Sequence, residues 1–131
     1  MKNYKLIADN FLLEIEFEVF EEDINLPTNS ILNIKINSDN FGAITTMDID
    51  IKMFQKFAEE LFNVYASLQG YAELKETYGN NFIMFKAKSN GHIYVNGTVN
   101  NLCRNGYEQE LKFENAFDQT YLKEFVNEIN K

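Results

Sequence analysis

Acidic side chains are concentrated near the start of the chain. Seven of them fall between Asp9 and Asp23, and no lysine or arginine occurs from Leu6 through Ile34. Paired carboxylates serve as acid and nucleophile in glycoside hydrolases, where an apolar pocket raises the pKa of one partner. The glutamates at positions 14, 16 and 18 instead alternate with apolar residues, at a spacing of about 7 Å along an extended strand. The pattern therefore favours a solvated strand face over a catalytic pair.

The sequence offers little for nucleophilic or metal chemistry. His92 is the only histidine and Cys103 the only cysteine, so an internal disulfide is excluded and no metal site is predicted. His92 precedes the apolar Ile93 in an alternating segment, which predicts an exposed strand histidine without a triad around it. Cys103 beside Arg104 is typical of a small apolar filler near a turn. Because no glycine-rich phosphate motif is present either, we expect no cofactor and no catalytic residue.

Length and charge limit the class of protein. The 131 residues are 45% hydrophobic and carry a formal net charge of −8. A chain of this size is expected to fold as a single domain, here over residues 1–131. The negative charge opposes direct binding of nucleic acid, which depends on Lys and Arg, and it favours a basic protein partner. The absence of a signal-peptide pattern and of a long apolar run predicts a cytoplasmic protein that does not enter the membrane.

Hydrophobic periodicity predicts where the strands and helices lie. Alternation with a period of two predicts strands over residues 11–19, 31–38 and 41–49, and a helical period runs from Ile51 to about Gly70. After it come four strand-like segments and a second helical stripe, over residues 71–77, 81–89, 92–100, 107–115 and 122–129. The order βββ-α-ββββ-α predicts an α+β fold, with one antiparallel sheet of about seven strands and both helices packed on one sheet face.

The outward positions of these strands and the loop that leaves the first of them hold the candidate binding residues. The loop is predicted from Glu21 to Ser30, because Pro27 and Asn29 supply turn chemistry. Cross-strand Lys–Glu pairs would keep such a face soluble and add little stability, but seven acids without a local counter-charge exceed what solubility requires. Phe20 and Tyr94 are predicted to point outward beside acids, as aromatic side chains at binding hot spots do. The partner-binding candidates are Glu14, Glu16, Glu18, Phe20, Glu21, Glu22, Asp23 and Tyr94.

Four segments resemble a known family in their order and spacing. They read FEVFEEDINLPTNSILNIKINSDNFGA, FAEELFNVYASLQGYAEL, GHIYVNGTV and FENAFDQTYLKEFVNEI. Over about residues 10–130, the chain resembles the small bacterial immunity proteins of the WapI family. The resemblance implies a cytoplasmic antitoxin that binds and blocks the C-terminal domain of a contact-dependent polymorphic toxin, typically a nuclease. It supplies no set of toxin-contacting residues, so the interface has to be predicted from this sequence.

Two other functions remain open at this stage. One is a small non-catalytic scaffold or adaptor domain that self-associates or binds another protein. The other is a small enzyme that uses His92 with a nearby carboxylate, although no motif supports it. The sequence leaves the oligomeric state open, and edge strands would also allow binding by strand addition.

Overall fold

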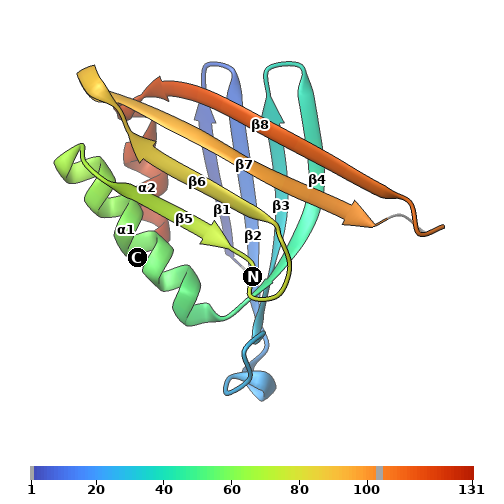
Figure 1. Cartoon of the computed structure of the whole chain (residues 1–131). Helices are drawn as coiled ribbons and strands as arrows, with labels where there is room; N and C mark the ends of the chain where they lie inside the picture. Colours follow the sequence, from blue (N-terminus) through green and yellow to red (C-terminus); the bar gives the residue numbers. More distant parts are fainter. Residues whose placement is uncertain (1, 103–104) are drawn as a thin grey trace.

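Two antiparallel sheets of four strands each, with two helices beside them, make up the fold (Figure 1). The structure is a computed structural model that describes residues 2–102 and 105–131. Cys103, predicted to be a small apolar filler near a turn, and Arg104 lie outside the described residues. The α+β class is confirmed, whereas the prediction of one sheet of about seven strands is wrong, because the two sheets are separate.

The first sheet is a meander with the strand order β1-β2-β3-β4. Its strands are β1 (Lys2–Ala8), β2 (Phe11–Val19), β3 (Ser30–Ser38) and β4 (Phe41–Ile49). The sequence did not predict strand β1, because only Tyr4, Leu6 and Ala8 face inward and the exposed Ile7 interrupts the alternation of apolar and polar residues. It pairs in register with β2 across the turn at Asp9 and Asn10.

The second sheet is a meander with the order β5-β6-β7-β8. Its strands are β5 (Tyr71–Lys75), β6 (Phe82–Ala87), β7 (His92–Leu102) and β8 (Glu108–Asp118). Strands β7 and β8 pair over their whole 11-residue length. In Figure 1 this sheet crosses in front of the first one, so the inner faces of the two sheets cover each other.

The longer helix, α1 (Ile51–Ser67), starts where the sequence predicts and ends three residues before the predicted stop at Gly70. The Asp50 carboxylate accepts a hydrogen bond from the Lys52 amide at 2.8 Å, as an N-cap does. Leu68 ends the helix in the left-handed conformation, with a φ of 57°. Three short 3₁₀ turns, η1 (Glu21–Asp23), η2 (Ser89–Gly91) and η3 (Gln119–Leu122), and the seven-residue helix α2 (Lys123–Ile129) complete the fold.

The helices fill one open side of the sheet pair, which differs from the prediction that both cover one face of a single sheet. Helix α1 packs against β5 and β6, α2 packs against β1, and the two helices contact each other. On the opposite side β4 approaches β7, where the Thr45 hydroxyl donates to the Asn100 carbonyl at 2.7 Å. Two helices of 17 and 7 residues cannot cover eight strands, so the sheets must bury each other.

Candidate partner-binding surface

The glutamates of β2 lie on the outer face of the first sheet, as the alternation predicts. Strand pairing places Glu14 between Lys5 of β1 and Lys35 of β3. The Lys5 ammonium lies 3.1 Å from the Glu14 carboxylate. Glu14 therefore does have a local counter-charge, which the lysine-free segment of the sequence concealed because it comes from the neighbouring strands. Glu16, in contrast, lies between Asn3 and Asn33.

We expect the substitution Lys5→Met to lower the free energy of unfolding by at most about 1 kcal/mol, because both members of the Lys5–Glu14 pair are partly exposed. Urea denaturation measures the change, and Lys35→Met on the other side of Glu14 is the matched control. A loss of about 2 kcal/mol or more with Lys5→Met alone would show that this ion pair does more than keep the face soluble.

The remaining acids lie on a loop that projects from the first sheet. We call residues 20–28 the acidic loop; it joins β2 to β3 and extends below both sheets in Figure 1. Glu21, Glu22 and Asp23 form the 3₁₀ turn η1 and are all exposed. The described structure contains no salt bridge to any of the three. Their charges are therefore available to a partner.

Apolar side chains accompany these acids on the acidic loop. Phe20, Ile24 and Leu26 are between 39% and 54% exposed. Apolar groups of this size gain by leaving water, and a group of them within one short loop is typical of a contact surface. Sequence reasoning identified Phe20 but missed Ile24 and Leu26. Ile24 and Leu26 could have been found because they lie in a loop and do not take part in the alternation of β2 and β3, whose apolar residues are buried.

A buried asparagine holds the acidic loop in place. The side chain of Asn29 is 1% exposed and donates to the Ile24 carbonyl at 3.0 Å. Its side-chain oxygen, Oδ1, accepts hydrogen bonds from the Ile51 amide and the Ser30 hydroxyl, each at 2.8 Å. The Phe20 amide donates to the Asn29 backbone carbonyl at 2.8 Å. These bonds connect both ends of the loop to the start of α1. Binding a partner should therefore cost the loop little conformational entropy.

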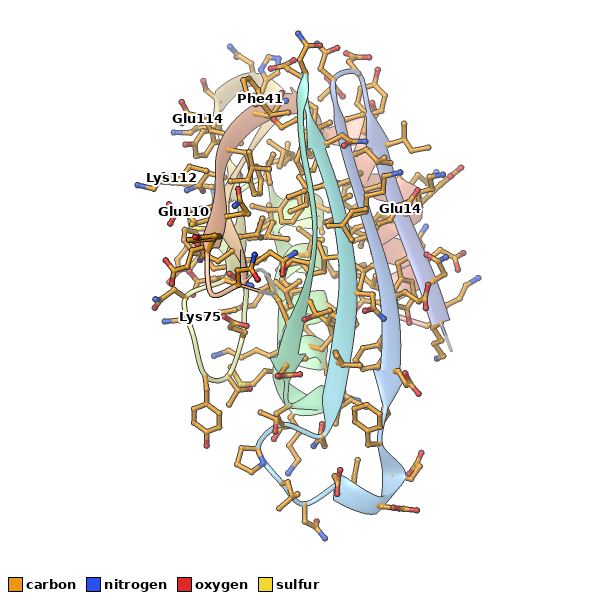
Figure 2. All side chains as sticks on the ribbon, turned by 90° about the vertical axis from the view of Figure 1, so that its right-hand side faces the viewer. Glu14, Phe41, Lys75, Glu110, Lys112 and Glu114 are labelled. Carbon is orange, nitrogen blue, oxygen red and sulfur yellow. The ribbon has the colours of Figure 1, made fainter. Side chains whose placement is uncertain are left out.

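Tyr94 lies away from the other candidates. It projects from the outer face of the second sheet, where its hydroxyl donates to the Glu114 carboxylate at 2.6 Å. That hydrogen bond raises the pKa of Tyr94, and the Lys88 ammonium lies 5.1 Å from the ring centroid. Figure 2 shows Glu14 and Glu114 on opposite sides of the molecule. The structure thus brings together the candidates of β2 and the acidic loop, and it separates Tyr94 from them.

The described residues show no arrangement suited to catalysis around His92. This side chain is exposed, and strand pairing places Asp118 opposite it. The Asp118 carboxylate accepts a hydrogen bond from the Thr120 amide at 2.9 Å and so caps η3. This hydrogen bond lowers the pKa of Asp118. Within residues 2–102 and 105–131, no group of three or more His, Cys, Asp or Glu side chains is placed to hold a metal ion.

Comparison with known proteins identifies the family. The model of the immunity protein WapI-like family matches residues 6–131. The chain belongs to this family. A search of curated proteins finds no match. Membership in the immunity protein WapI-like family indicates an immunity function and a protein partner, the toxin that such a protein counteracts. In the part of the chain that the structure describes, no helix is long and apolar enough to cross a membrane.

Proposed function

We propose that this chain neutralises a cognate toxin domain by binding it, with the acidic loop at the centre of the contact. Family membership supports the immunity function. The observation that carries the choice of surface is the loop held by the Asn29 hydrogen bonds, which combines three exposed acids with three exposed apolar side chains. Interfaces use such apolar anchors for affinity and charged groups for orientation and rate of association.

The charge of the protein fits a toxin that acts on nucleic acid. A nuclease holds a polyanion with Lys and Arg, so its substrate cleft is basic. A net charge of −8 attracts such a cleft over a distance, and the acidic loop would occupy it in place of the substrate phosphates. Inhibition of this kind requires no catalytic residue in the immunity protein, and we propose that the chain is not an enzyme.

The direct test is titration calorimetry against the toxin domain that is encoded next to this protein, at low and high salt. We expect one-to-one binding whose affinity falls as salt rises, because screening weakens attraction between exposed charges beyond about 10 Å at 0.1 M salt. Absence of binding at either salt concentration would contradict the proposed function. Binding that is indifferent to salt would contradict the electrostatic part of it.

A second candidate function is self-association as a scaffold, and one observation favours it. Phe41 and Ile44 on the edge strand β4 are each 70% exposed. They line a groove of about 340 Å³ between β4 and the β7–β8 pair, on the side that faces the viewer in Figure 2. Unpaired edge strands with apolar side chains favour pairing with another chain. Sedimentation of the purified chain without toxin distinguishes the two functions, since an immunity protein need not form oligomers.

A further inference from the structure

The hydrophobic core opens to solvent at one place close to the acidic loop. A pocket of about 520 Å³ lies where β1, β2, the first turn of α1 and the C-terminal end of α2 meet. This volume falls in the range of about 300–1,000 Å³ that is usual for ligand sites. Tyr4 and Phe17, which line the pocket, keep 8% of their surface exposed, whereas Leu13 and Ile15 of the same sheet keep none.

Aromatic rings line this pocket. The ring of Phe54 lies between those of Phe17 and Tyr4, with centroid distances of 4.7 Å and 6.1 Å and nearly parallel planes. Polar residues, among them Lys2, Gln55 and Lys131, also contribute to the lining. An apolar lining of stacked rings with polar groups beside it suits an incoming aromatic side chain, since rings gain from offset or edge contacts at centroid distances of about 4.5–7 Å.

The pocket and the acidic loop are parts of one continuous surface. Val19 lines the pocket, and the next residue, Phe20, begins the loop. Ile51 also lines the pocket, and its amide donates to Asn29, the residue that holds the loop. A protein that contacts the loop therefore lies next to the mouth of the pocket.

From this arrangement we propose that the pocket receives an aromatic side chain of the toxin domain that the acidic loop attracts. The inference rests on the proposed function and adds an anchor to it. The occupant is a protein side chain because the neighbouring loop displays three unpaired acids within a chain of net charge −8, which select a basic protein surface. Charge supplies the encounter, and the aromatic anchor supplies the slow dissociation.

A substitution at the pocket mouth tests this inference. Gln55 lines the pocket and is exposed on α1, so Gln55→Trp would place an indole in the opening without altering the core. We expect its dissociation constant for the toxin domain to rise about tenfold or more, mainly through faster dissociation. The control is Met53→Trp, since Met53 is exposed on the same helix and does not line the pocket. Thermal unfolding verifies that both variants fold.

The possible results separate the pocket from the proposed function. If the unmodified protein binds the toxin and Gln55→Trp binds equally well, the pocket proposal is overturned and the proposed function stands. If the unmodified protein does not bind, the proposed function itself fails. Free indole, followed by amide NMR shifts around Phe54, is the probe for a competing small ligand. Displacement of indole by the toxin domain supports the proposal, and retention of indole in the complex overturns it.

Discussion

Replacing Asn29 with alanine is expected to lower the free energy of unfolding by about 2–4 kcal/mol, because it leaves the buried Ser30 hydroxyl and the part-buried Ile51 amide without their partner. The side chain is 1% exposed and forms three hydrogen bonds, to the Ile24 carbonyl, the Ile51 amide and the Ser30 hydroxyl. The Ile51 amide is in the first turn of α1 and has no helical carbonyl to bind, so its partner has to come from outside the helix. One alanine would therefore weaken both the helix start and the acidic loop.

Urea denaturation measures this loss, and limited proteolysis measures cleavage within residues 20–28. We expect the loop of the Asn29→Ala variant to be cut faster, because its connection to Ile51 is gone. The control is Asn33→Ala, since Asn33 is exposed on β3 and should change stability by less than about 0.5 kcal/mol. Equal unfolding free energies and equal cleavage for the two variants would show that Asn29 does not hold the loop.

The individual elements could be predicted because their signals are local. Alternation identified seven of the eight strands, and the period change at Ile51 identified α1. The division into two sheets could not be predicted in this way, because alternation states which face of a strand is buried and not what covers it. Phe11 of the first sheet stacks on Phe113 of the second at 5.9 Å, a contact between residues far apart in the sequence.

For the candidate surface too, the sequence predicts the local features and not those that depend on contacts between distant residues. The exposed acids of the loop followed from composition and turn chemistry. The pairing of Lys5 with Glu14 depends on strand register, and the contact of Asn29 with Ile51 depends on where α1 begins relative to β3. The pocket combines the first and last parts of the chain, from Lys2 to Lys131. Contacts between residues so far apart in the sequence form only in the complete fold, so no short motif predicts them.

Reversing the charge of the acidic loop is expected to have the largest effect on binding. With Glu21, Glu22 and Asp23 all changed to lysine, we expect the dissociation constant for the toxin domain to rise about 100-fold, which equals about 2.7 kcal/mol. The three acids make up η1, and none of them is buried, so the fold should tolerate the change. Stopped-flow association should show most of the loss in the association rate, and raising the salt concentration should reduce the difference from the unmodified protein.

A matched variant separates the position of the charge from its amount. Lysine at Glu59, Glu73 and Glu108 changes the net charge by the same six units, from −8 to −2, at exposed sites outside the acidic loop. If net charge alone governs association, both triple variants lose affinity equally, and the assignment of the acidic loop is wrong. If the loop is the contact, the control variant loses only the long-range attraction to the toxin. Its affinity should then equal that of the unmodified protein in 0.5 M salt, because the Debye length falls to about 4 Å. A loss that persists in salt and is confined to the loop variant would place the toxin directly on Glu21, Glu22 and Asp23.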